Sequence, residues 1–244
     1  MENWFATWFN SPYYHTLYKH RNLLEAENFI DSLVGFLDFP RGAKALDLAC
    51  GKGRHSLQLK KKGFDVIGID LSEESIAEAK IYETDGLEFF EHDMRDLYWF
   101  EYFDLVANLF TSFGYFHNKE DDQKTLNSVS EGLKPGGLFV LDFMNVEKVI
   151  AELITHEEKT IGGIKYEITR DVENDIIVKR IHVIDGDIEL DFVEEVDALK
   201  LKDFTSYLEN AGMRIENVFG DYQLNPFNEE TSDRLILIAK KLKA

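Results

Sequence analysis

The stretch ALDLACGKGRHSLQLKKKGFDVIGIDLS, residues 45–72, determines which fold the chain adopts. Its two apolar runs, ALDLA and FDVIGID, predict buried strands, and the run between them predicts a helix that ends at Gly63. Gly51 and Gly53 occupy the turn between the first strand and the helix. Alternation of this kind is typical of a parallel sheet that is covered by helices on both faces.

The alternation extends in both directions from this stretch. Upstream, apolar residues at helical spacing predict one helix from about Tyr13 to Leu37, and Pro40 and Gly42 end it. Downstream, we expect helices at SEESIAEAKIYE, with Ser72 as the N-cap, and at KEDDQKTLNSVSEGLKPGG. We expect strands at LEFFEHD, YFDLVANLF and LFVLDFM, joined to the rest of the sheet by right-handed crossovers.

After about Asn145 the pattern becomes antiparallel. Residues 163–199, GIKYEITRDVENDIIVKRIHVIDGDIELDFVEEVDAL, alternate β-branched and polar residues, which predicts a meander of strands. The turn from Asp185 to Asp187 has the pattern of a tight hairpin rather than of a calcium loop. A helix at LKDFTSYLENAG and two strands, MRIENVFGDY and RLILIAKKL, complete the expected order.

Composition limits the classes of function. The 244 residues are 44% hydrophobic and 30% charged, as in an ordinary folded domain, and no apolar run approaches the length of a membrane span. The first residues lack the pattern of a signal peptide, and a single cysteine, Cys50, allows no internal disulfide, so we expect a cytoplasmic protein. The net charge of −19 opposes binding to nucleic acid and favours a neutral or cationic small molecule.

Two carboxylates indicate what the glycine turn binds. Such a turn lets a ligand approach backbone N–H groups at a helix N-terminus, although a purely structural turn would carry the same glycines. Asp70 ends the second strand, where a carboxylate can accept hydrogen bonds from both hydroxyls of a ribose. Asp47 stands beside the glycines, where it would repel a pyrophosphate and attract an amino group, and Ser56 replaces the third glycine of the dinucleotide fingerprint. Adenosine with a cationic amino-acid tail is S-adenosylmethionine.

These segments resemble, in order, the motifs of the class I S-adenosylmethionine-dependent methyltransferases. LDLACGKG resembles the family's Asp-x-x-x-Gly-x-Gly loop, GIDLS its acidic residue after the second strand, and EHDM the segment that frames the adenine. FDLVANLFTSFGYF resembles the fourth strand with the loop that faces the methyl group, and LKPGGLFVLDF resembles the turn into the fifth strand. The resemblance covers most of the chain and is closest to bacterial small-molecule enzymes with a strand insertion before the last helix.

The resemblance implies an α/β fold with a Rossmann-like, seven-stranded, mainly parallel sheet, helices on both faces, and a reversed C-terminal hairpin. An N-terminal helical lid and an inserted antiparallel β meander would be added to it. We therefore predict a single domain over residues 1–244, divided into the lid (1–40), a cofactor-binding core (41–145), the β insertion (155–198), and the last helix with the C-terminal hairpin (199–244).

The resemblance also implies which residues hold the cofactor. The glycine loop would bind the amino-acid end, Asp70 the ribose, and Asp93 with Met94 the adenine, while Arg21 of the lid would pair with the methionyl carboxylate. The full set of expected cofactor residues is Tyr14, Arg21, Asp47, Ala49, Cys50, Gly51, Gly53, Asp70, Leu71, Asp93, Met94, Asn108 and Leu109.

A second set would line the acceptor pocket, although aromatic residues also bury readily for packing alone. These residues are Phe113, Tyr115, Arg180, Tyr222 and Phe227. His117 could serve as a general base, with a surface histidine as the alternative, and Asp142 is a second candidate.

We therefore predict in-line transfer of a methyl group from S-adenosylmethionine to a small-molecule acceptor, leaving S-adenosylhomocysteine. We expect no metal, no nucleic-acid partner, no membrane association, and a monomer or homodimer. The alternatives are a Rossmann oxidoreductase that uses NAD and a non-catalytic module that only binds the cofactor. The sequence does not identify the acceptor.

Overall fold

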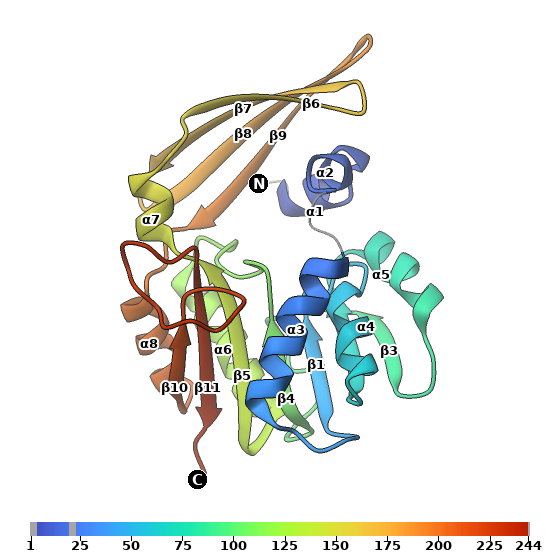
Figure 1. The fold of residues 1–244 in the computed structure, drawn as a ribbon, viewed down its shortest axis with the longest axis vertical. Coiled ribbons are helices and arrows are strands. Elements are labelled where there is room, and N and C mark those ends of the chain that lie inside the picture. The colour runs from blue at the N-terminus through green and yellow to red at the C-terminus, as the bar shows by residue number, and fades with distance from the viewer. Residues whose placement is uncertain (1–3, 20–22, 244) are drawn as a thin grey trace.

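The computed structural model describes residues 4–19 and 23–243 (Figure 1). Seven strands form one sheet in the order β10-β11-β5-β4-β1-β2-β3, and β11 runs in the direction opposite to the other six. This confirms the predicted mainly parallel sheet with a reversed C-terminal hairpin. The strands are β1 (Lys44–Leu48), β2 (Asp65–Asp70), β3 (Leu87–Glu91), β4 (Phe103–Asn108), β5 (Leu133–Met144), β10 (Met213–Phe219) and β11 (Arg234–Lys241).

Helices cover both faces of this sheet because its strands alternate apolar side chains between the two faces. On one face, Ala45 and Val66 pack with apolar residues of α3 (Leu23–Leu37), α4 (Arg54–Lys61) and α5 (Glu73–Ala79), which continues into the 3-10 turn η1 (Lys80–Tyr82). On the other face, Leu46 and Ile67 belong to a cluster that includes residues of α6 (Lys119–Gly132) and α8 (Leu201–Asn210). The sheet is therefore the middle layer of a three-layer core.

A second, antiparallel sheet follows the short helix α7 (Val146–Ala151). Its strands are β6 (His156–Ile161), β7 (Ile164–Glu173), β8 (Ile176–Asp185) and β9 (Ile188–Asp197), in that order. The predicted meander and its tight turn are confirmed, since Asp185 pairs with Ile188 across a two-residue connection. Asn174 and Asp175 form another tight turn, where both have positive φ, as the twist of a two-residue hairpin requires.

The N-terminal region differs from the single helix predicted upstream of Pro40. The chain forms α1 (Trp4–Phe9), which the spacing did not indicate, and then α2 (Pro12–Leu17), which is separate from α3. Ser11 caps α2, with its hydroxyl accepting from Tyr13 N–H, and Pro12 occupies the first turn. Figure 1 shows α1 and α2 between the second sheet and the core. Packing against that sheet, through a cluster that includes Trp8 and Leu17, overrides the local helical pattern.

None of the helices in the described part of the chain combines the length and the apolar character needed to span a bilayer.

Candidate functional site

The glycine turn is held against β2 by backbone hydrogen bonds. Cys50 N–H donates to the carbonyl of Ile69 at 2.9 Å, and Gly51 N–H donates to Oδ2 of Asp70 at 2.8 Å. Ala49, Gly51 and Gly53 all have positive φ. A Cβ at Gly53 would lie 2.6 Å from Cζ of Phe89, whereas a Cβ at Gly51 would meet no atom within 4 Å. Gly53 is thus required for packing, and Gly51 leaves open space above the turn.

Asp70 is the carboxylate that joins this turn to α5. Its Oδ2 accepts from Gly51 N–H, and its Oδ1 accepts from Ser72 N–H at 2.9 Å. Burial raises the pKa of Asp70, and the backbone hydrogen bonds oppose that rise. A carboxylate has about four lone-pair sites, so two further donors can be accommodated.

A cavity of about 620 Å³ lies over the turn. Its floor is the turn with Arg54 and His55 of α4, and one wall consists of residues 70–73, 75 and 91–94. The opposite wall comes from the segment after β4: Leu109, Phe110, Ser112, Tyr115 and Phe116. The roof is supplied by α1, α2 and the residues that follow them: Phe5, Phe9, Asn10, Tyr14, His15, Tyr18 and Lys19.

Most of the residues expected to hold the cofactor line this one cavity. They come from α2, the glycine turn, the ends of β2 and β3, and the end of β4, which are far apart in the sequence. They are Tyr14, Ala49, Cys50, Gly51, Asp70, Leu71, Asp93, Met94 and Leu109.

Three others lie behind the lining, and Arg21 falls outside the described residues. Asp47 is 1% exposed, and its Oδ2 accepts from the hydroxyl of Ser56 at 2.5 Å. Burial raises the pKa of Asp47 to about 6. Asn108 is fully buried and donates from Nδ2 to the carbonyl of Leu48 at 3.0 Å, and Gly53 packs on Phe89. Asp47 therefore contacts the start of α4 rather than the cavity.

Asp93 is paired at the cavity wall. Arg95 donates from Nη2 to Oδ2 of Asp93 at 2.6 Å and also reaches Asp121 at 3.1 Å. Burial alone would raise the pKa of Asp93, but the hydrogen bonds and charge of Arg95 hold it below the ordinary value. Asp93 therefore stays an acceptor at neutral pH.

Among the residues expected around the acceptor, the structure brings only Tyr115 into the cavity lining, and its hydroxyl donates to the carbonyl of Thr111. The other residues of that set lie elsewhere. Phe113 is buried against Phe204 in the core, and Phe227 packs at the edge of the same core cluster. The hydroxyl of Tyr222 donates a hydrogen bond to Asp142, and Arg180 forms an ion pair with Glu173.

His117 also lies outside the cavity lining. Its Nδ1 is 2.7 Å from Oδ1 of Asp197, and its Nε2 is 3.3 Å from Oε2 of Glu195. Both carboxylates belong to β9, so the imidazole joins the segment after β4 to the second sheet. Since both ring nitrogens are engaged there, the geometry gives no support to His117 as the base.

Three histidines line the cavity, His15, His55 and His92, and none of them was among the expected site residues. His55 is 5% exposed, and its Nε2 has no hydrogen-bond partner among the described residues. Burial, reinforced by Arg54, lowers its pKa well below the usual value. Burial and the charge of Lys52 lower the pKa of His15 as well. The only sequence signal for His55 was its position directly after the glycine turn.

The roof of the cavity is fastened at two places. Glu194 of β9 accepts from Nε1 of Trp8 at 2.6 Å and from the hydroxyl of Tyr18 at 2.7 Å, and Lys179 pairs with it at 3.1 Å. The hydroxyl of Ser72 donates to the side-chain oxygen of Asn10, which ties the turn between α1 and α2 to the start of α5. The roof thus bridges the second sheet and the core.

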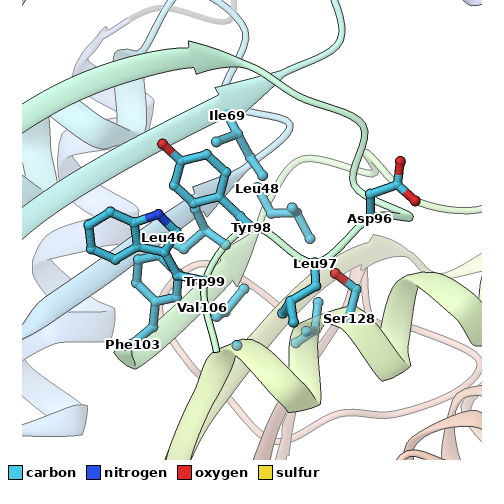
Figure 2. A pocket seen from close by; sticks show the side chains of 12 residues that line it. Leu46, Leu48, Ile69, Asp96, Leu97, Tyr98, Trp99, Phe103, Val106 and Ser128 are labelled. Carbon is cyan, nitrogen blue, oxygen red and sulfur yellow. The ribbon is translucent and has the colours of Figure 1, made fainter. Parts of the chain in front are cut away.

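Another cavity, shown in Figure 2, lies between the sheet and α6 and is lined by residues that include Leu48, Val106 and Trp99. Its volume of about 10 Å³ is at the lower limit for one water molecule, so it is too small for a substrate. Within residues 4–19 and 23–243, no group of three or more His, Cys, Asp or Glu side chains has an arrangement that could hold a metal ion.

Comparison with known proteins agrees with this geometry. A family model described as a methyltransferase domain matches residues 40–212. The YqeM protein of Bacillus subtilis, named as a methyltransferase, is 31% identical over 215 residues, covering 84% of this chain and 86% of that protein. A dTDP-4-amino-2,3,4,6-tetradeoxy-D-glucose N,N-dimethyltransferase of Saccharopolyspora spinosa is 27% identical over 189 residues, covering 74% and 75% of the two chains.

A crystal structure of an S-adenosylmethionine-dependent methyltransferase from Clostridium acetobutylicum has the same fold, with a TM-score of 0.79 at 24% identity, covering 95% of this chain and 97% of that one. The family match over residues 40–212 agrees with the structure. Both the order of strands in the sheet and the glycine turn bound to Asp70 are features of the same fold. The chain belongs to the S-adenosylmethionine-dependent methyltransferases of the class I fold.

Proposed function

We propose that this methyltransferase transfers the methyl group to an amine nitrogen of a small molecule bound beneath α1 and α2. The observation that carries the proposal is the cavity of about 620 Å³, which has a polar cofactor cradle on one side and aromatic side chains on the other. A volume of this size is ordinary for a small-molecule site and leaves room for two ligands side by side.

The residues of the cradle fit S-adenosylmethionine, which when bound supplies an electrophilic methyl group on a sulfonium. The Asp70 carboxylate has lone pairs left for the ribose hydroxyls, and Asp93 stays ionised to accept from the adenine amino group. Gly51 leaves space for the amino-acid end above the N-terminus of α4. Asp47 acts through Ser56, whose position it fixes at the start of that helix.

The aromatic side suits an amine. Phe5, Phe9 and Tyr14 of the roof line the cavity together with Tyr115 and Phe116, and the rings of Phe9 and Tyr115 are in contact at 5.7 Å between centroids. Aromatic faces attract a cationic amine, and the net charge of −19 concentrates cations near the protein. Displacement of water by these rings favours the uncharged amine, which has the lone pair that attacks. His15, whose pKa is lowered, can accept the proton that the nitrogen releases.

The name of the Saccharopolyspora relative supports an amine acceptor, since that protein dimethylates the amino group of a nucleotide sugar. The match covers 74% of this chain. A division of the chain into a lid (1–40), a core (41–145), a β insertion (155–198) and a C-terminal part (199–244) is consistent with the two sheets and is part of the proposal.

The proposal predicts selectivity for nitrogen. The enzyme is incubated with methyl-labelled S-adenosylmethionine and matched pairs of acceptors, namely a dTDP-amino sugar with its hydroxyl counterpart, and glycine with glycolate. We expect label in at least one amine, at least about 100-fold above its hydroxyl partner, because a neutral amine is a much stronger nucleophile than a hydroxyl group, which must lose its proton during the attack. The transfer is measured by mass spectrometry of the products.

Preferential labelling of the hydroxyl compounds would contradict the choice of an amine. Binding of the cofactor without labelling of any acceptor would favour the alternative of a module that binds but does not catalyse.

A further inference from the structure

The segment after β4 has a backbone conformation that its residue types do not favour. Phe110 and Thr111 are consecutive non-glycine residues with φ of 70° and 61°. An aromatic and a β-branched side chain are both strained in the left-handed region, so surrounding contacts must impose this conformation. Leu109, Phe110 and Ser112 line the cavity, which places the strained backbone at the reaction site.

A buried carboxylate of β5 holds both strained residues. Asp142 is fully buried, and its Oδ2 accepts from Phe110 N–H at 2.8 Å. Its backbone carbonyl accepts from Thr111 N–H at 2.9 Å. The side chain and the carbonyl of Asp142 therefore satisfy the N–H groups of Phe110 and Thr111, which form no hydrogen bond of the sheet.

Arg234 and Tyr222 fix that carboxylate in turn. Arg234 of β11 donates from Nε to Oδ1 of Asp142 at 2.7 Å and from Nη2 to Oγ1 of Thr111 at 3.0 Å. The hydroxyl of Tyr222 donates to Oδ2 of Asp142 at 3.2 Å. The same side chains also contact the ring of Phe110, since the guanidinium of Arg234 lies 5.7 Å from its centroid and Tyr222 stacks at 6.0 Å.

We propose that Asp142, Arg234 and Tyr222 are positioning residues for methyl transfer, which act through the segment 109–112. Asp142 accepts from the backbone of the segment that forms one wall of the cavity. Arg234 and Tyr222 hold the Asp142 carboxylate, so all three act on this wall and not on a remote part of the core. If Asp142 no longer accepts from Phe110, the left-handed pair relaxes and the wall moves. Displacements of about 1 Å at a reaction site suffice to reduce binding and catalysis greatly.

The test compares Asp142→Ala with Asp104→Ala in the whole enzyme. Asp104 accepts from Lys44 N–H and from Nζ of Lys134, both at 2.8 Å, near the start of β4, away from the cavity. Binding of S-adenosylhomocysteine is measured by calorimetry and amide exchange of residues 109–112 by mass spectrometry. We expect Asp142→Ala to raise the dissociation constant about tenfold or more and to accelerate exchange, and Asp104→Ala to change neither.

Conservative variants separate positioning from general stability. Asp142→Asn with Arg234→Gln keeps hydrogen-bonding groups at both positions without the charges, and we expect it to recover affinity to within about threefold of the wild type. If Asp142→Ala does not fold, Tyr222→Phe, which removes one hydroxyl, is expected to accelerate exchange of the segment. A lowered melting temperature with unchanged affinity in Asp142→Ala, or wild-type exchange in Tyr222→Phe, would overturn the proposal.

Discussion

Replacement of Asp70 by alanine is expected to raise the dissociation constant for S-adenosylhomocysteine by about 100-fold. Hydrogen bonds to a charged group contribute about 1.5–3 kcal/mol each, and the ribose hydroxyls would lose this acceptor. The substitution also removes the acceptor for Gly51 N–H and Ser72 N–H, so the glycine turn loses its attachment to the end of β2. Isothermal titration calorimetry measures the change directly.

Asp65→Ala is the matched control for this experiment. Asp65 is the first residue of the same strand, and it pairs with Lys44 at 2.8 Å at the opposite end from the cavity. We expect Asp65→Ala to leave the dissociation constant unchanged and Asp70→Asn to give an intermediate value. An affinity within about threefold of the wild type in Asp70→Ala would remove Asp70 from the cofactor site.

Replacement of Asp122 by asparagine is expected to stabilise the protein above pH 7. Asp122 is 1% exposed, and its Oδ1 has no partner in the described part of the chain. Burial first, and then the charge of Asp197, raise its pKa to about 7, with His117 opposing the rise. Tyr207 hydrogen-bonds to the same carboxyl, and the side-chain oxygen of asparagine can replace that acceptor.

The pH dependence follows from this raised pKa. In the unfolded chain an aspartate ionises near pH 4, whereas folded Asp122 stays protonated until about pH 7, so the wild type loses stability as pH rises across this window. Asparagine does not ionise, and its advantage should therefore grow by about 4 kcal/mol from about pH 4 to pH 7, at about 1.4 kcal/mol for each pKa unit, and then stay constant. For a chain of this size that corresponds to a gain of about 8–16 °C in melting temperature at pH 8.

Thermal unfolding at several pH values tests this prediction. Glu120→Gln is the control, because Glu120 is an exposed residue of the first turn of the same helix, α6. Its effect should be small and almost constant between pH 6 and pH 8. A gain in Asp122→Asn that is equal at pH 4.5 and pH 8 would show that the Asp122 carboxyl does not titrate as described.

The core of the fold was predictable because its signals are local. Each strand from Lys44 to Met144 is a short apolar run, and each turn between them carries glycine or a capping residue such as Ser72. The N-terminal helices were not predictable in the same way. Their ends depend on packing against the second sheet, through Trp8 and Leu17, and on the bond of Tyr18 to Glu194, which is 176 positions away in sequence.

The residues of the site also differ in whether local sequence signals predict them. The spacing of the motifs predicted that residues of the glycine turn and of the strand ends belong to the site, and most of them line one cavity. Asp47 was expected at the cavity surface, but the alternation of side chains along β1 buries it against Ser56. Phe113 and Phe227 could not be separated from cavity residues by type alone, since burial depends on which way each turn directs its side chain. Roles assigned to the site residues stay predictions.

The most direct test of the account is a calorimetric titration of the wild-type protein with S-adenosylhomocysteine and, separately, with NAD. We expect S-adenosylhomocysteine to bind one site per chain and to raise the melting temperature, and NAD to do neither, because the ribose acceptor Asp70 is present but Ser56 replaces the third glycine of the dinucleotide fingerprint. Binding of NAD without binding of S-adenosylhomocysteine would contradict the account.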